Sequence, residues 1–365
     1  MRVLFTSPAL FGEPGVFGGG ERYAACLARA VAEQTGGATL LAAAERDEER
    51  QDGPLRVLAR RPWSYIRGQR TNPLPRGLWE ATRGTDVVHC FQWRITMTTA
   101  AILAGRLRRA PVFVTDLGGG GYDLSGYVDT ARFATGLLHL SSYAQSLSAR
   151  AGSPHDAVLY GGSDGLRERA AGGGGGGGGP TVLFVGRLLP HKGVDVLLEA
   201  AEAGWEIELV GAPLDARYRD DLNQLAAGKR VSFRGAVSDA ELEEAYARAA
   251  VVVVPSVYRN RYGQETAVPE LLGLVAIEAG ARGIPVVASR VASLPEVVED
   301  GVTGLLVPPG DPAALREAVG ALLRDPPQRE RLGRAAQQRV SERFTWGRAA
   351  EVALAAYGRA LGGKR

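Results

Sequence analysis

The stretch VPELLGLVAIEAGARGIPVVAS, residues 268–289, carries the pattern that decides the fold. Pro269 and Gly273 disfavour a helix interior, so we expect a helix that begins near Gly273 and runs through about Ala281. The apolar run IPVVAS (284–289) follows at once and predicts a buried strand. A helix that leads into a strand apolar on both faces is typical of a parallel sheet covered by helices.

The same alternation continues along the chain. The segments 21–34, 239–249 and 345–361 have apolar residues at helical spacing, and Ser238 or Asp239 is the expected cap of the second helix. The runs that predict buried strands are 2–7, 38–44, 55–59, 86–91, 111–116, 137–141, 157–160, 181–186, 206–211, 231–235, 251–256, 284–289 and 303–308. The sequence therefore predicts an α/β protein with two Rossmann-like, doubly wound parallel sheets.

A boundary between two domains is expected in the middle of the chain. A length of 365 residues favours two domains, and eight consecutive glycines (172–179) predict a flexible connector. We predict an N-terminal domain over 1–170, a linker over 171–180 and a C-terminal domain over 181–344, with the last helix (345–365) packed back on the first domain. Ligands of such sheets bind at the carboxyl ends of the strands, so we expect a cleft between the domains there.

Composition excludes several classes of protein. The hydrophobic fraction of 45% and the charged fraction of 23% are typical of a globular chain, and a net charge of +3 gives no case for nucleic-acid binding. No segment reaches about 18 apolar residues, so we expect no membrane span. Cys26 and Cys90 lie in apolar segments and form no disulfide framework, which favours a reducing cytoplasm.

Two acids frame the predicted helix start. Glu270 would lie in the loop before the helix and Glu278 within it, while the backbone amides of Gly273, Leu274 and Val275 would be free to bind an anion. A ligand with a sugar, a diphosphate and a ribose matches that order. Two acids at this spacing are also common on solvated helix surfaces, so the pair needs further support.

A second stretch, VLFVGRLLPHKG (182–193), supplies cations at the end of a predicted strand. Gly186 and Arg187 end the strand, and Lys192 follows in the next turn. Two cations five residues apart at this edge suit a pyrophosphate, although two solvated loop charges are the simpler alternative.

Motifs in the second half resemble a known family. They are GRLLPHKGVDVLLEA (186–200), FRGAVSDAELEEAYARAAVVVVPS (233–256), PELLGLVAIEAGARGIPVVAS (269–289) and SLPEVVEDGVTGLLVPPGDPAALREAV (293–319). Together they are similar to retaining glycosyltransferases of family GT4, which have the GT-B fold. The resemblance covers about 181–361, and the first half matches more loosely through GGGERYAACLARA and DVVHCF.

The resemblance implies an enzyme that transfers a sugar, with retained anomeric configuration, from a UDP-, GDP- or ADP-sugar to an acceptor hydroxyl on a glycan, a lipid-linked sugar or a secondary metabolite. The abundance of arginine, alanine and glycine, with only three lysines, suggests a bacterial source. The resemblance implies no metal and no cofactor, and the chain has no D-x-D sequence that would clamp one. Carried over by position, Arg187 and Lys192 bind the diphosphate and Glu270 contacts the donor sugar. Further donor contacts are implied for Gly19, Gly20, Gly186, Gly235, Val237, Gly273, Leu274, Val275 and Glu278.

Two stretches in the first half concern the sugar side of the reaction. FGGGERY (17–23) predicts a glycine loop before a helix, either a tight turn or, as the resemblance implies, a cover over the donor phosphates. In VTDLGGGGYD (114–123), Leu117 stands where many family members have a histidine. Asp116 and His89 are therefore candidates for contact with acceptor or donor sugar, although Asp116 could equally cap its loop and His89 lies within an apolar run. Without an evident base, we expect front-face transfer.

Arginines are concentrated between residues 56 and 109, where eleven of them stand against the acids Glu80 and Asp86. RRPWSYIRGQR (60–70) interleaves them with aromatic residues. This segment is either a solvated face or a surface that meets an anionic membrane at the cytoplasmic side.

Other functions stay open at this point. A sugar phosphorylase could share the fold. A nicotinamide-dependent dehydrogenase would need a G-x-G-x-x-G turn followed by an acid after the second strand, and neither half supplies one. A sugar- or nucleotide-binding module would keep the site without requiring Arg187 together with Lys192.

Overall fold

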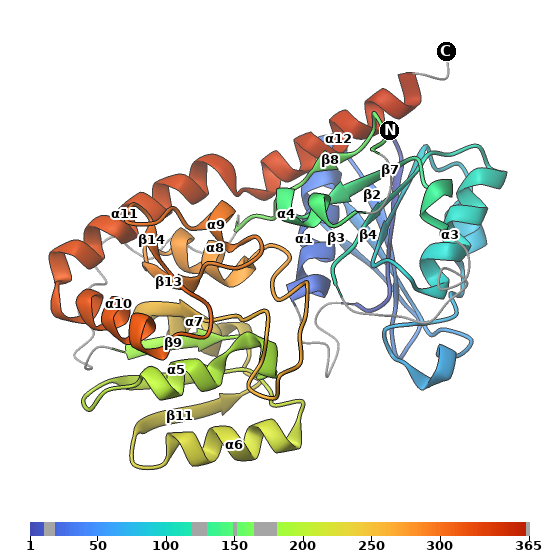
Figure 1. Ribbon diagram of the computed structural model, residues 1–365. Coiled ribbons are helices and arrows are strands. Elements are labelled where there is room, and N and C mark those ends of the chain that lie inside the picture. Colours follow the sequence, from blue (N-terminus) through green and yellow to red (C-terminus); the bar gives the residue numbers. More distant parts are fainter. Residues whose placement is uncertain (11–18, 119–129, 149–151, 164–180, 363–365) are drawn as a thin grey trace. The chain divides into compact units, whose positions relative to one another are not determined.

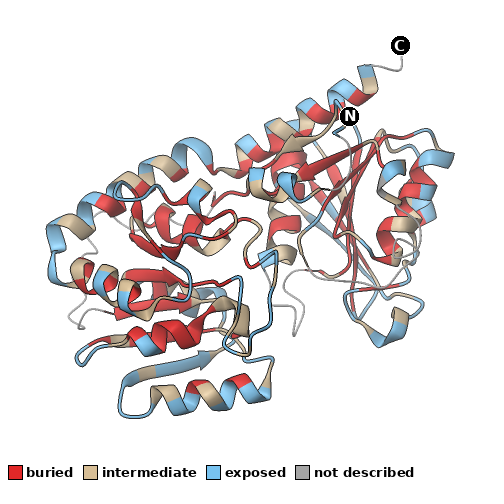
Figure 2. Ribbon diagram, viewed as in Figure 1, coloured by how far each residue is buried: buried red, intermediate tan, exposed pale blue. Residues whose placement is uncertain are grey.

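The computed structural model describes residues 1–10, 19–118, 130–148, 152–163 and 181–362. The chain forms two compact units, one made of 1–161 with 346–365 and the other of 162–345 (Figure 1). The predicted linker, 171–180, lies outside the described residues. Each unit is an α/β sandwich in which buried strands lie beneath helices with an exposed outer face (Figure 2).

The sheet of the first unit has the strand order β3-β4-β2-β1-β5-β6-β7-β8. Apart from β3 its neighbouring strands are parallel. The strands are β1 Val3–Ser7, β2 Ala38–Ala43, β3 Glu48–Asp52, β4 Leu55–Arg60, β5 Val87–Phe91, β6 Val112–Thr115, β7 Gly136–His139 and β8 Ala157–Val158. Because β1, β5 and β6 are buried on both faces, they consist of the near-continuous apolar runs that the sequence shows.

Edge strand β3 was not predicted from the sequence, and it pairs antiparallel to β4. Its sequence, EERQD, is almost entirely exposed, so no hydrophobic alternation marks it. Backbone pairing with β4 holds it, which is a common arrangement at a sheet edge. The predicted parallel sheet is therefore confirmed, with one antiparallel strand added at its edge.

The helices of the first unit come from both ends of the chain. They are α1 Gly19–Thr35, α2 Leu78–Ala81, α3 Thr96–Leu107, α4 Ser142–Ser146 and α12 Trp346–Gly362. The rings of Tyr23 on α1 and Trp346 on α12 meet edge to face at 4.9 Å, and the Gln34 side chain donates to the Gly347 carbonyl. The last helix is therefore part of the core of the first unit.

The second unit contains six parallel strands in the order β11-β10-β9-β12-β13-β14. They are β9 Thr181–Val185, β10 Glu206–Val210, β11 Arg230–Gly235, β12 Ala249–Val254, β13 Val286–Ser289 and β14 Gly304–Val307. Numbered from β9, this is the 3-2-1-4-5-6 order of a doubly wound Rossmann sheet. Its strand order reverses between β9 and β12, and this switch point is where such sheets bind ligands.

Helices cover this second sheet. They are α5 Val194–Ala200, α6 Ala216–Ala226, α7 Asp239–Arg248, α8 Leu274–Ala281, α9 Leu294–Val297, α10 Pro312–Arg324 and α11 Pro326–Arg343. Helix α8 confirms the predicted start beside Gly273 and the predicted end at Ala281. Ser238, rather than Asp239, is the cap of α7, where it forms a capping box with Glu241.

Candidate active site

The carboxyl ends of β9 and β12 bring together the stretches that carried the sequence argument. Gly186 and Arg187 follow β9, and the 3-10 turn Pro190–Lys192 leads from there into α5. The backbone amide of Val257, just after β12, donates to the His191 carbonyl at 2.9 Å, which joins the two strand ends. Residues far apart in the sequence thus meet at the switch point of the sheet.

Lys192 and Glu270 contact each other directly at this point. The Lys192 Nζ donates to Glu270 Oε1 and, at 3.2 Å, to the Pro269 carbonyl. The two side chains are only 17% and 16% exposed. The buried Ser256 hydroxyl donates to Glu270 Oε1 at 3.4 Å, and the buried Ser293 hydroxyl donates to the Glu270 carbonyl at 3.3 Å. These contacts fix a positive and a negative group side by side.

Two glycines make this arrangement possible. Gly193, which begins α5, has φ +68°, and a β-carbon there would lie 2.0 Å from the Pro255 carbonyl oxygen. Gly273, which begins α8, has φ +84°, and a β-carbon there would lie 2.8 Å from Leu294 Cδ2. Both positions require a left-handed backbone and a close approach, which only glycine provides readily.

The amino end of α8 points backbone donors out of the helix. The Gly273 carbonyl accepts bonds from the amides of Ala276 and Ile277, as in an ordinary first turn. In the part of the chain that the structure describes, the amides of Leu274 and Val275 have no recorded acceptor. Free amides and the helix dipole together favour an anion at this end.

Glu278 lies within α8, eight residues after Glu270 in the sequence, and is largely buried, with 8% of its surface exposed. Tyr246 on α7 donates its hydroxyl to Glu278 Oε2 at 2.8 Å, which orients the carboxylate. Arg282 stacks on the Tyr246 ring at 4.3 Å and forms an ion pair with Glu243. The acid that was predicted to meet a ribose is therefore tied to a structural cluster between α7 and α8.

Glycines also bring the ends of β9, β10 and β11 together. The Gly211 amide donates to the Gly235 carbonyl at 2.8 Å, and a β-carbon on Gly211 would lie 1.9 Å from the Gly186 oxygen. Beyond these strand ends Arg187 is exposed, and it has no carboxylate partner among the described residues. Val237 is half-buried just before α7.

The pKa of His191, which lies beside Lys192 at the switch point, is lowered by its surroundings. Burial lowers the pKa of His191 to about 4, and the charges of Lys192 and, to a lesser extent, Arg187 act in the same direction. The imidazole is therefore neutral at physiological pH. The positive charge of the site comes from Lys192 and Arg187.

In the first unit, the structure places His89 in the core. Its side chain is fully buried, Nδ1 lies 2.6 Å from the Tyr357 hydroxyl, and Nε2 lies 2.8 Å from Thr115 Oγ1. Burial lowers the pKa of His89 to about 3. With both nitrogens engaged and no exposed surface, His89 does not reach a sugar, and its candidacy as a sugar contact was wrong.

Asp116 stands at the carboxyl end of β6, with exposed surface. It accepts backbone bonds from Trp93 at 3.2 Å and from Gly118 at 3.3 Å, so it organises its own loop. Surrounding protein raises the pKa of this carboxyl, while these two amides and Arg94 oppose the rise.

Next to this strand end, the glycine stretch 17–23 differs from the prediction. Gly19 and Gly20 form the first turn of α1 rather than a loop, and residues 11–18 lie outside the described residues. A β-carbon on Gly20 would lie 3.3 Å from Leu117 Cβ, so the glycine packs beside the position where the resemblance expects histidine.

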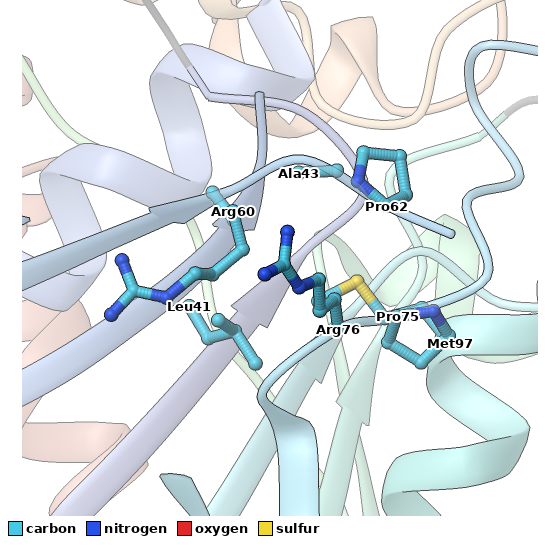
Figure 3. Close-up of a pocket in the computed structure, with 8 residues that line it drawn as sticks. Leu41, Ala43, Arg60, Pro62, Pro75, Arg76 and Met97 are labelled. Carbon is cyan, nitrogen blue, oxygen red and sulfur yellow. The ribbon is translucent and has the colours of Figure 1, made fainter. Parts of the chain in front are cut away.

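A small pocket opens at the carboxyl ends of β2 and β4 in the first unit (Figure 3). It is lined by Leu41, Ala42, Ala43, Arg60, Pro62, Pro75, Arg76 and Met97. Arg60 donates to the carbonyls of Glu48 and Ala59, and Arg76 forms an ion pair with Asp47 at 3.2 Å. This pocket lies at the ligand-binding edge of its sheet.

These contacts belong to a wider neutralisation of the arginine-rich segment. Acids from 45–49, which precede the arginine-rich interval 56–109, form four ion pairs with arginines of that interval. The pairs are Arg56–Glu49, Arg60–Glu49, Arg70–Glu45 and Arg76–Asp47. Within 60–70, Arg60 and Arg70 are therefore paired with acids, and the charge of this segment is partly compensated.

Sequence reasoning missed three residues that hold the site. Ser256 and Ser293 bond to Glu270, and Tyr246 bonds to Glu278. Ser256 follows a predicted strand directly, a position at the ligand edge that could have drawn attention to it. Ser293 and Tyr246 carry no such signal, because their roles arise from packing between segments distant in sequence.

The geometry defines a class of protein: two doubly wound α/β units, one with paired lysine and glutamate at its switch point and an open helix amino end. Residues 173–339 match the family described as Glycosyl transferases group 1. This match lies in the second unit and covers less than half of the chain, so the second unit is similar to this family, GT4, and the two units together have the GT-B fold. Among the described residues, no cluster of three or more histidine, cysteine or acidic side chains forms a metal site.

Curated relatives show a similarity over the same part of the chain. The chain is 38% identical over 188 residues to a D-inositol 3-phosphate glycosyltransferase of Corynebacterium diphtheriae, covering 48% of this chain and 41% of the relative. It is 37% identical over 194 residues to an alpha-maltose-1-phosphate synthase of Mycobacterium tuberculosis, covering 49% and 47%. The chain thus matches less than half the length of each.

Similarity to solved structures extends over the whole chain. Sucrose-phosphate synthase from Thermosynechococcus elongatus superposes with a TM-score of 0.74 at 23% identity, with 100% of both chains covered. Anabaena Alr3699/HepE, solved in complex with UDP-glucose, superposes with a TM-score of 0.72 at 22% identity, again with 100% of both chains covered. At this identity the likeness establishes the fold.

Proposed function

We propose that this protein is a retaining glycosyltransferase that moves a sugar from a nucleoside-diphosphate sugar to an acceptor hydroxyl without a metal ion. The observation that carries the proposal is the Lys192–Glu270 pair, set at the switch point of the second sheet beside Arg187. Departure of a nucleoside diphosphate develops negative charge, and fixed cations and a helix amino end stabilise it.

Each group has a part in this reaction. Arg187 and Lys192 bind the diphosphate together with the amides of Leu274 and Val275. Glu270, positioned by Ser256 and Ser293, contacts hydroxyls of the donor sugar. Since no described group near this pair is poised as a base, the leaving phosphate oxygen takes the acceptor proton on the same face of the sugar, which retains the anomeric configuration.

Remaining donor contacts follow the fold. Gly186, Gly235 and Val237 lie along the nucleoside, and Glu278 bonds the ribose through the carboxylate that Tyr246 orients. In the first unit, we assign Gly19, Gly20 and Asp116 to contact with the transferred sugar or the acceptor. A UDP-sugar is the first donor to test, because Alr3699/HepE was solved with UDP-glucose.

Nucleotide binding tests the proposal directly. Titration of the full chain with UDP, GDP, ADP and their glucose conjugates, followed by calorimetry, should select one nucleotide. Arg187→Met should weaken that binding at least tenfold, since one phosphate contact is lost. Arg230→Met, which removes an exposed arginine of β11 that is paired with Glu206 of β10, is the matched control and should leave nucleotide binding unchanged.

Sugar transfer is assayed separately from nucleotide binding. With the selected donor, NMR of the released or transferred sugar should show retained configuration in the first product formed. Absence of nucleotide binding, or equal losses in both arginine variants, would remove the donor-site assignment. Binding without any turnover across sugar acceptors would leave a binding module, and cleavage that requires inorganic phosphate would identify a phosphorylase.

A further inference from the structure

A hairpin of residues 257–268 follows strand β12 and leads directly into the segment that carries Glu270. The Thr266 amide donates to the Tyr258 carbonyl at 2.8 Å, which pairs the two arms of the hairpin. At the tip the chain turns through Gly263, whose φ of +76° is typical of the last residue in a short hairpin loop. We call this segment the 257–268 hairpin.

Tyr258 ties the base of the hairpin to the segment that supports Glu270. Its hydroxyl accepts a bond from the Ala292 amide at 2.8 Å. Ala292 has φ +49°, a left-handed conformation that persists in a residue other than glycine only where surrounding contacts hold it. The next residue, Ser293, donates to the Glu270 carbonyl at 3.3 Å. The base of the hairpin and the acid therefore share one support.

The tip of the hairpin is anchored by Arg261 to two helices. Its guanidinium lies 3.8 Å from carboxylate oxygens of Asp195 and Glu199 on α5, and 3.5 Å from one of Asp221 on α6. The arginine side chain is 28% exposed and that of Asp195 only 7%. Tyr262, the next residue of the tip, donates its hydroxyl to Asp221 at 2.5 Å. One arginine thus faces three acids that come from two helices.

Burial gives this anchor more weight than a surface ion pair has. The Tyr218 hydroxyl donates to Asp195 Oδ1 at 2.6 Å, and Tyr218 is fully buried. Burial raises the pKa of Asp195, while the Tyr218 hydroxyl and the charge of Arg261 oppose the rise. Loss of the arginine would leave a nearly buried carboxylate and two neighbouring acids without the cation that they share. The tip would then be released from both helices.

The anchor also joins the two segments that carry the Lys192–Glu270 pair. Asp195 lies in the first turn of α5, three residues after Lys192. At the other end of the hairpin, Pro269 alone separates it from Glu270. The contact between Arg261 and Asp195 therefore connects the segment of the lysine to the segment of the glutamate.

We propose that Arg261 is a positioning residue for Glu270, which it holds in place through the 257–268 hairpin. The inference rests on the proposed function, in which Glu270 contacts the donor sugar. Sugar transfer requires that such a group be placed to a fraction of an ångström, so a loosened hairpin lowers the rate of the chemical step. In this role Arg261 acts through the chain rather than on the substrate.

Hydrogen exchange of the full chain tests the anchor without any substrate. Arg261→Met should raise the exchange rate of backbone amides in 257–272 by at least about tenfold, because the tip loses its cation. Tyr262→Phe removes a single hydroxyl bond and should raise the rate in the same segment by a smaller factor. Arg316→Met is the matched control: it removes a half-buried arginine that donates to two carbonyls at the carboxyl end of α5, and it should leave exchange in the hairpin unchanged.

Turnover tests whether the anchor serves Glu270. With the selected donor, Arg261→Met should lower kcat by at least about tenfold, whereas Arg316→Met should not. The Kd of the nucleoside diphosphate should change by less than about threefold in Arg261→Met, since Arg187 and the amides at the amino end of α8 lie outside the hairpin.

A conservative variant separates charge from geometry. Distances of 3.5–3.8 Å to three acids indicate attraction between charges rather than a forked hydrogen bond, and lysine can supply that charge. Arg261→Lys should therefore recover most of the kcat that Arg261→Met loses.

Three results would overturn the proposal. Unchanged exchange in both Arg261→Met and Tyr262→Phe would show that this cluster does not hold the tip. Raised exchange with unchanged kcat would show that Glu270 does not depend on the hairpin. Losses of kcat that are equal in Arg261→Met and Arg261→Lys, or in Arg261→Met and Arg316→Met, would leave only a general effect on the fold.

Failure of the proposed function would look different. An unaltered chain that transfers no sugar would refute that function and, with it, the role of Arg261 in catalysis. Hydrogen exchange would still decide whether Arg261 anchors the hairpin.

Discussion

Breaking the Lys192–Glu270 pair should separate its structural role from its catalytic one. Both side chains are about one-sixth exposed, so Lys192→Met leaves a mostly buried carboxylate without its cation. Loss of one partner from a fully buried pair costs about 3–5 kcal/mol, and the remaining exposure here lowers the expected loss to about 2 kcal/mol. Urea unfolding of the full chain measures it.

The double variant Lys192→Met with Glu270→Gln tests the origin of that loss. It contains no unpaired charge, and Ser256 and Ser293 can still bond to residue 270, so its stability should return to within about 1 kcal/mol of the unaltered chain. Activity should not return. Each single variant and the double variant should lose at least about 3 kcal/mol of transition-state stabilisation, roughly 150-fold in kcat/KM.

Two results would refute this reasoning. A double variant that regains both stability and turnover would show that neither charge acts on the substrate, and that the pair serves only the fold. A Lys192→Met chain with unchanged unfolding free energy would show that Glu270 does not depend on the lysine for its charge. Measurement of both quantities on the same preparations keeps the two outcomes distinct.

Two further predictions concern stability. Gly193→Ala should lower the free energy of unfolding by more than about 4 kcal/mol, because its β-carbon would meet the Pro255 carbonyl. Gly228→Ala, with φ +76° and open space around it, should lower it by about 1 kcal/mol. Urea unfolding compares the two variants, and equal losses would contradict the close contact at Gly193. His89 has a folded-state pKa of about 3 against about 6.5 when unfolded, so its neutral form favours the fold and stability is lost as pH falls below 6.5. Between pH 7 and 5 the loss from this group should be about 2 kcal/mol, and His89→Gln should flatten that pH dependence relative to the unaltered chain; an unchanged slope would place the titration elsewhere.

Sequence periodicity predicted most of the fold because most of its strands are buried. Each buried parallel strand must be apolar on both faces, so β1, β9 and β12 stand out as short continuous runs. Strand β3 could not be predicted in this way, since its residues are exposed and charged and it pairs with β4 at the edge of the sheet without an apolar face. The register and order of strands are likewise set by packing between distant segments.

The candidate site was predictable in its parts but not in its assembly. Lys192 and Glu270 each drew attention by position, yet nothing in the sequence indicated that they contact each other. The ion pairs of several arginines were likewise not predictable, because charge was counted along the chain while an acid such as Glu49 lies across a strand pair from Arg56. His89 failed as a sugar contact because helix α12, from the far end of the chain, covers it.

The position of helix α12 has a consequence for synthesis of the protein. Translation delivers the strands of the first unit early, but Tyr357, whose hydroxyl bonds to the buried His89 of strand β5, is made only after the whole second unit. The second unit is continuous from 162 to 345, so it can finish folding on the ribosome while the first unit still lacks helix α12. A premature stop within α12 would damage the half of the protein that was translated first.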